Sequence, residues 1–177
     1  AYLDLAPRTV ISPYVHEWLG DALYAGGAYT EALAAYTAAI ATAPDISAEV
    51  GVREKLALLH VARQDYAAAI AQYDAILAVA RIRAYRARIE HQAAETLLLA
   101  GESEAGYARH MAVVENYSDT RPAYLSLVKL VEAGRPPDDF LRGVVDYYGG
   151  AYGPAVEAFS RYVQASPDAH RADAHWY

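Results

Sequence analysis

The sequence contains no cysteine, and no apolar run in it approaches the length of a membrane span. Without Cys, neither a disulfide nor thiolate chemistry is available, although the cellular compartment stays open. A transmembrane helix needs about 20 consecutive apolar residues, so we expect no membrane span in these 177 residues. No signal peptide is visible.

Basic residues and large apolar residues are also scarce. Fifteen Lys and Arg stand against 22 Asp and Glu, for a net charge of −7. Because phosphate binding needs a basic surface, a nucleic-acid partner is not expected. The chain has two Phe, two Trp and one Met, beside 16 Tyr and 39 Ala. Ala has the highest helix propensity but buries little surface, so this composition favours thin helical layers over one thick core.

The chain lacks the common catalytic and metal-binding motifs. It has no HExxH run, no phosphate loop and no G-x-S-x-G. The six His show no metal-ligand spacing: His16, His60, His91 and His110 are scattered, and His170 and His175 lie five apart. We therefore expect structural or exposed histidines, no metal and no cofactor.

Internal repetition is the strongest feature that is present. A small residue is followed at fixed offsets of nine, twelve, sixteen and twenty-four residues by an aromatic, an Ala, a second aromatic and a Pro. The first copy is Gly20, Tyr29, Ala32, Tyr36 and Pro44, and the last is Gly143, Tyr152, Ala155, Phe159 and Pro167. A middle copy has Ala57, Tyr66, Ala69 and Tyr73, with Arg81 in place of Pro.

This pattern resembles the tetratricopeptide repeat, which has a 34-residue period. The resemblance implies an all-α solenoid of antiparallel helix pairs that forms a right-handed superhelix. We expect one helical-repeat domain over 1–177, with repeats at about 13–46, 50–83, 84–118 and 137–168 and an irregular segment at 121–148. Partial helices at 1–6 and 172–177 indicate a segment truncated at both ends. Chance similarity in an Ala-rich helical protein is the alternative.

Each repeat position has a packing role. Gly20 or Ala57 lets the first helix of a pair approach the second. Tyr29 or Tyr66 is the first residue of the second helix and covers the turn between the two helices. An Ala three residues later lies where helices cross, and the second aromatic follows on the same face. Pro ends the helix.

Hydrophobic periodicity and turn residues give a coarse map. Helices are predicted at 14–26, 29–43, 47–63, 66–79, 82–99, 103–117, 121–133, 138–148 and 151–165, with another from about 172. The helix near 121–133 breaks the two-by-two pairing.

Two groups of residues are candidates for binding. Arg81, Arg83, Arg86 and Arg88 form the one basic cluster. Cations are unfavourable early in a helix, so either carboxylates such as Asp74 or Glu90 offset them or an anionic ligand does. Tyr24, Tyr147 and Tyr148 lie on first helices of their pairs, where aromatics could grip a peptide or stack on sugars. Packing is the alternative role for these tyrosines.

A narrower resemblance comes from Tyr124 to Val128, Gly134 to Pro137, Leu141 to Tyr148, Ala155 to Pro167, and the helix that opens with Ala174 to Tyr177. These runs are similar to the helical region that precedes the catalytic domain in bacterial soluble lytic murein transglycosylases. The resemblance implies a non-catalytic scaffold in a cell-envelope peptidoglycan enzyme, with murein strands as a partner. The alternative is a free-standing, cytoplasmic adaptor whose concave groove binds a peptide or partner protein. The one Glu-Ser pair, Glu102-Ser103, lies in a polar turn, unlike the buried acid of such enzymes.

Overall fold

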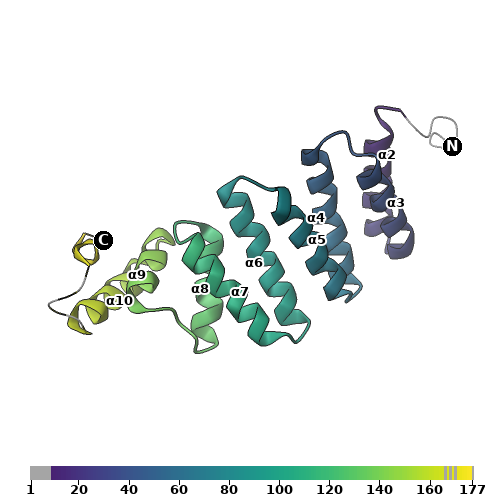
Figure 1. The fold of residues 1–177 in the computed structure, drawn as a ribbon. Coiled ribbons are helices and arrows are strands. Elements are labelled where there is room, and N and C mark those ends of the chain that lie inside the picture. The colour runs from purple at the N-terminus through teal and green to yellow at the C-terminus, as the bar shows by residue number, and fades with distance from the viewer. Residues whose placement is uncertain (1–8, 166, 168, 170, 177) are drawn as a thin grey trace. The chain divides into compact units, whose positions relative to one another are not determined.

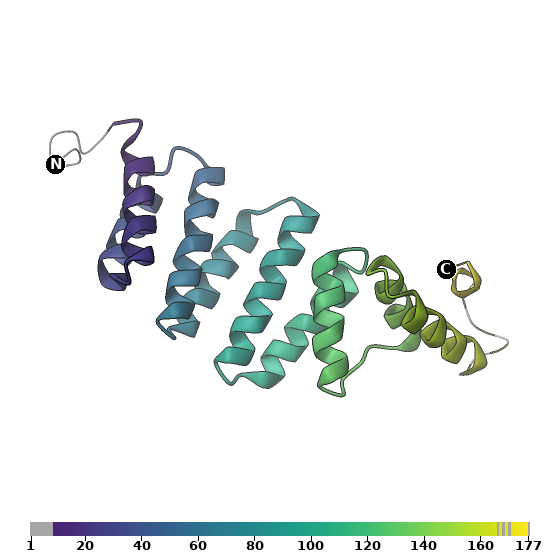
Figure 2. The same ribbon diagram turned by 180° about the vertical axis from the view of Figure 1, so that it is seen from behind.

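The computed structural model describes residues 9–165, 167, 169 and 171–176. All regular structure in these residues is helical, with nine α-helices, one short 3-10 helix and no strand (Figures 1 and 2). The predicted all-α class, built from repeated helix pairs, is confirmed. The predicted partial helix at 1–6 lies outside the described residues. None of the described helices is long and apolar enough to cross a membrane.

The chain divides into two compact units after Ala80. The N-terminal unit contains α2 (Ser12–Ala25), α3 (Tyr29–Ala41), α4 (Ile46–Ala62) and α5 (Tyr66–Val79). Each helix packs against the next one along the chain. The buried side chains of α3 and α4 form a core of Ala, Val, Leu and Tyr residues.

The C-terminal unit contains α6 (Arg83–Leu99), α7 (Ser103–Asn116), α8 (Arg121–Glu132), α9 (Asp139–Tyr148) and α10 (Tyr152–Ala165). Helices α6 and α7 form one pair, and α9 and α10 form another. The unpaired helix is α8, which packs against α6, α7 and α9. A 3-10 helix, Ala172–His175, follows and contacts α10. The sequence predicted the start of a longer helix here.

Helix starts follow the capping chemistry of the sequence. Asp45 precedes α4 and accepts a hydrogen bond from the Ala48 backbone N–H at 2.8 Å. Asp138 does the same for Leu141 at the start of α9, at 3.0 Å. Such caps satisfy an otherwise unpaired N–H of the first turn. The predicted boundaries of the nine described α-helices agree with the observed ones to within two residues.

The repeat positions have a common packing geometry. A Cβ atom on Gly20 would lie 2.5 Å from the Tyr36 ring, and one on Gly143 would lie 2.6 Å from the Phe159 ring. The aromatic ring therefore rests directly on the small residue of the first helix. Buried repeat residues are Gly20, Ala32, Tyr36, Ala57, Ala69, Tyr73, Gly143, Ala155 and Phe159. Tyr29, Tyr66 and Tyr152 are the first residues of α3, α5 and α10, whereas Pro44 and Pro167 follow α3 and α10.

The spacing between the first three repeats is 37 residues. The small residues Gly20 and Ala57 are followed, at the same spacing, by Ala94 on α6. The turn residues repeat in the same way, because Gly27, Gln64 and Gly101 all have positive φ, at 77°, 61° and 82°. This 37-residue register places His110 at the position of Tyr36 and Tyr73, which a 34-residue period would not.

Candidate functional site

The N-terminal unit contains a polar network whose four residues have counterparts in the candidate site of the C-terminal unit. Lys55 Nζ lies 2.7 Å from Glu17 Oε1 and 2.7 Å from Asp21 Oδ2. The Tyr36 hydroxyl donates a hydrogen bond to Asp21 Oδ1 at 2.8 Å. Burial and the neighbouring carboxylate raise the pKa of Tyr36, so this phenol stays protonated and donates. The four residues form a paired and hydrogen-bonded set.

The C-terminal unit has a counterpart for each of these four residues, 74 residues further along the chain. His91 replaces Glu17, Glu95 corresponds to Asp21, His110 replaces Tyr36, and Lys129 corresponds to Lys55. The contacts recur as well: His110 Nε2 lies 3.1 Å from Glu95 Oε1, and Lys129 Nζ lies 3.3 Å from Glu95 Oε2. We call His91, Glu95, His110 and Lys129 the histidine cluster.

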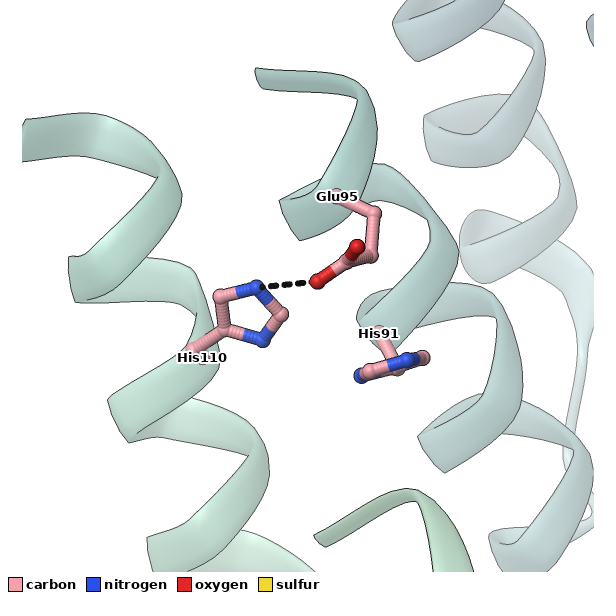
Figure 3. Close-up of side chains that lie close together, drawn as sticks. All are labelled: His91, Glu95 and His110. Carbon is pink, nitrogen blue, oxygen red and sulfur yellow. Dashed lines mark ion pairs between the residues drawn. The ribbon is translucent and has the colours of Figure 1, made fainter. Parts of the chain in front are cut away.

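Three helices position the histidine cluster. His91 and Glu95 lie one turn apart on α6, so they share a face. His110 comes from α7 and Lys129 from α8. Figure 3 shows the His110 ring and the Glu95 carboxylate facing each other across the two helices, with the His91 ring below the carboxylate. The two ring centroids are 5.3 Å apart.

Ser126 on α8 joins the two imidazoles. Its Oγ is 2.9 Å from His91 Nδ1 and 3.0 Å from His110 Nδ1. Ser126 and His110 are fully buried. A hydroxyl can accept two hydrogen bonds and donate one, so Ser126 can accept from both Nδ1–H groups. In that arrangement the Nε2 atom of each imidazole carries a free lone pair.

Two buried atoms in this cluster lack a hydrogen bond. Among the described residues, His110 Nε2 and Glu95 Oε1 face each other without hydrogen-bond geometry. Burial lowers the pKa of His91. Burial and then the neighbouring His91 lower the pKa of His110, although Glu95 opposes the shift. Both imidazoles are therefore neutral at pH 7.

His91 and His110 show no metal-ligand spacing in the sequence, but the structure brings the two rings together. One ring nitrogen of each, and one Glu95 carboxylate oxygen, lie within 4.8 Å of one another, so the three side chains could together hold a metal ion. Local motif spacing could not show this, because the two His are on different helices. A comparison of the sequence with itself at an offset of 74 residues, twice the repeat spacing, could have found the pair. At that offset His91 aligns with Glu17 and His110 with Tyr36, which are both polar.

The predicted arginine cluster is engaged in surface contacts. Arg83 donates to Asp119 at 2.6 Å and to the Asn116 carbonyl, and its guanidinium lies 5.1 Å from the Tyr117 ring centroid. Asp119 and Arg83 are both half-exposed, where such pairs contribute about 0–1 kcal/mol. Asp119, in the turn after α7, thus offsets Arg83 in the way that we predicted for a neighbouring carboxylate.

The other three arginines lie on or just before α6. Arg86 Nε is 3.4 Å from the Tyr117 hydroxyl, and Arg88 stacks on Tyr85 at 4.9 Å. Arg81 is exposed in the segment before α6. Glu90, which we predicted as a partner, instead pairs with Arg109 at 2.7 Å.

The candidate tyrosines are in aromatic contact with repeat residues. Tyr24 lies 5.6 Å from Tyr29, and Tyr147 lies 5.7 Å from Tyr152, between the ring centroids. Tyr148 packs on Tyr147 at 5.5 Å and is 51% exposed. Tyr24 and Tyr147 therefore combine packing with partial exposure, while Tyr148 is mainly a surface residue.

Comparison with known proteins gives no family for the chain. No protein-family model matches the sequence, and none of the curated proteins searched is similar to it. The structure itself defines the class as an all-helical protein of repeated helix pairs, compatible with a tetratricopeptide-like solenoid.

Proposed function

We propose that this chain is a non-catalytic helical-repeat module that binds a partner helix on the exposed face of α2. The observation that supports this is a difference between equivalent residues of consecutive repeats. Leu56 on α4 is 4% exposed, because it packs in the core formed with α3. Its counterpart 37 residues earlier, Leu19 on α2, is 43% exposed, and the adjacent Trp18 is 66% exposed.

The repeat itself indicates which occupant fits this face. Helix α3 covers α4 with Ala32, Tyr36 and Ala39, which are almost completely buried. A partner helix with the same small–aromatic–small spacing would cover Leu19 in the equivalent way. Trp and Tyr at such positions are typical of residues that dominate binding energy, and exposed apolar patches mark interaction sites.

A peptide of the α3 sequence, Ala28 to Ala43, stapled to hold it helical, is the probe. Trp176→Phe leaves Trp18 as the only tryptophan, so a blue shift of its emission reports coverage of the face. We expect saturable binding that Leu19→Glu weakens at least tenfold. The matched control is Leu58→Glu, because Leu58 is 48% exposed on α4 and should leave binding unchanged.

Two results would contradict this function. One is an unchanged Trp18 emission up to millimolar peptide. The other is a dimer in light scattering that Leu19→Glu dissolves, because the face would then be an interface between copies of this chain.

A second candidate is the scaffold of a cell-envelope lytic transglycosylase, with murein strands as the ligand. The group of Tyr147, Tyr148 and Tyr152 supports it, because exposed aromatic rings can stack on sugars. Co-sedimentation with purified murein should then fall at least tenfold in Tyr148→Ser. If the parent chain and Tyr148→Ser bind murein equally, or if neither binds, the scaffold function in a lytic transglycosylase is contradicted.

The proposal of a non-catalytic role has its own support. Glu102 is exposed at the start of α7, whereas an acid of the lysozyme kind needs an apolar cleft that keeps it protonated. Murein turbidity should therefore not fall when this chain is added.

A further inference from the structure

We propose that His91, Glu95 and His110 form a binding site for Zn²⁺ or a similar first-row divalent metal ion. The three side chains come from α6 and α7, within the C-terminal unit, and offer two imidazole nitrogens and one carboxylate oxygen within 4.8 Å. This donor set suits zinc and its neighbours, since imidazole and carboxylate are both common zinc ligands.

The distances are close to those of a metal site. A tetrahedral zinc ion with bonds of about 2.0–2.1 Å separates its ligand atoms by roughly 3.3 Å. His110 Nε2 and Glu95 Oε1 are already 3.1 Å apart. An ion between them would satisfy both atoms, which have no hydrogen bond among the described residues. A ring nitrogen of His91 lies within 4.8 Å of the other two donor atoms, so His91 completes the set by a side-chain movement of at most roughly 1–2 Å.

Ser126 supplies the second shell that histidine ligands require. A ligating imidazole usually donates its other N–H to a nearby oxygen, which fixes the tautomer. The His110 Nδ1–H can donate to Ser126 Oγ at 3.0 Å, which leaves the lone pair on Nε2, the atom that faces Glu95. Ser126 is 0% exposed and therefore holds a fixed position.

Lys129 is the group that opposes a cation. Its Nζ lies 3.3 Å from Glu95 Oε2, which is the carboxylate oxygen that faces away from His110. The Lys129 side chain is 43% exposed, so its ammonium can turn into solvent when a metal ion takes Glu95. Since Glu95 is also 35% exposed, an ion and a water ligand can reach the site from solvent.

The N-terminal unit offers a test that preserves the fold. The double variant His91→Glu/His110→Tyr installs the residues that occupy the same positions in the network of Glu17, Asp21, Tyr36 and Lys55. This variant should fold, as judged by far-UV circular dichroism, and should lack the metal site. His60→Gln is the matched control, because His60 is a buried histidine outside the cluster.

Isothermal titration of the full chain with ZnCl2 should show one equivalent bound tightly, and CoCl2 should give the visible absorption of tetrahedral cobalt. We expect binding to weaken at least a hundredfold in the double variant and at least tenfold in Glu95→Gln, with no change in His60→Gln. If the double variant fails to fold, the proposal is judged on whether Glu95→Gln weakens metal binding at least tenfold. Absence of binding in the parent chain, or equal binding in the cluster variants, overturns the proposal.

Discussion

Substitution of Gly20 by Ala should destabilise the N-terminal unit, although Ala is the better helix former. A Cβ at position 20 would lie 2.5 Å from Tyr36 Cε1 and 2.6 Å from Cδ1. Ordinary carbon contacts need about 3.5–4.0 Å, so the ring must move by about 1 Å. Its freedom to move is limited, because the hydroxyl is held by Asp21 at 2.8 Å and the side chain is 2% exposed.

The magnitude follows from two opposing terms. Overpacking of a buried site costs about 1–3 kcal/mol, while Gly to Ala in a helix interior gains about 1 kcal/mol. Gly51→Ala on α4 isolates the second term, because a Cβ there meets nothing within 4 Å. The two variants should therefore differ in unfolding free energy by about 1–3 kcal/mol, with Gly51→Ala the more stable.

Urea unfolding followed by far-UV circular dichroism measures both variants against the parent chain. Tyr36→Phe removes the anchoring hydrogen bond, so a double variant with Gly20→Ala should show a smaller loss than the sum of the two single changes. Equal stability of Gly20→Ala and Gly51→Ala would refute the close packing of the Tyr36 ring on α2.

Three further predictions concern a helix crossing, a repeat turn and a buried carboxyl group. Ala69→Leu should lower stability by about 1–3 kcal/mol because Ala69 is fully buried, whereas Ala67→Leu on the exposed side of α5 should have little effect; equal melting temperatures would contradict this register. Gln64→Gly should raise the unfolding free energy by about 1 kcal/mol, because Gln64 has a φ of 61° and a non-Gly residue in this region is strained; a loss in urea unfolding would contradict it. Burial raises the pKa of Asp146 above its ordinary 3.8 despite the Arg142 partner, so the fold favours the protonated carboxyl and loses stability as pH rises from about 4 through the raised value. Asp146→Asn should remove this loss, so its stability relative to the parent should increase from pH 4 to pH 7 in parallel thermal melts; a constant difference would contradict the assignment.

The sequence was sufficient for the helices and for contacts within a helix pair. Offsets such as the sixteen residues from Gly20 to Tyr36 arise because a short turn fixes two antiparallel helices in register, so the same offset gives the same contact in Gly143 and Phe159. The partners of Arg83 could not be predicted, because Asp119 lies 36 residues away, beyond α7. A long polar side chain on the surface can reach several partners, and the periodicity of the sequence does not show which partner it contacts.

The histidine cluster was missed for a different reason. His91 lies near the middle of α6 and His110 near the middle of α7, so no local motif contains both. Their proximity depends on the repeat register, in which position 110 is the buried aromatic position and position 95 follows the small residue Ala94. A search at multiples of the 37-residue spacing would have aligned His110 with Tyr36 and Glu95 with Asp21, and Tyr36 and Asp21 are in contact across an antiparallel helix pair.

The last repeat shows that this buried position does not need polar residues. There, 123 residues beyond the first repeat, Phe140, Val144 and Phe159 replace Glu17, Asp21 and Tyr36. The two Phe rings contact each other edge to face at 5.9 Å, and Val144 and Phe159 are buried. Burying a polar or charged group costs free energy unless it is fully paired, so an apolar set serves packing at a lower cost. The histidine cluster pairs Glu95 with Lys129 but leaves His110 Nε2 and Glu95 Oε1 without a hydrogen bond, so it is less favourable for packing alone than the apolar set. A ligand that binds these atoms gives the arrangement a physical reason, and this is why the metal titration, more than any stability measurement, tests what the C-terminal unit does.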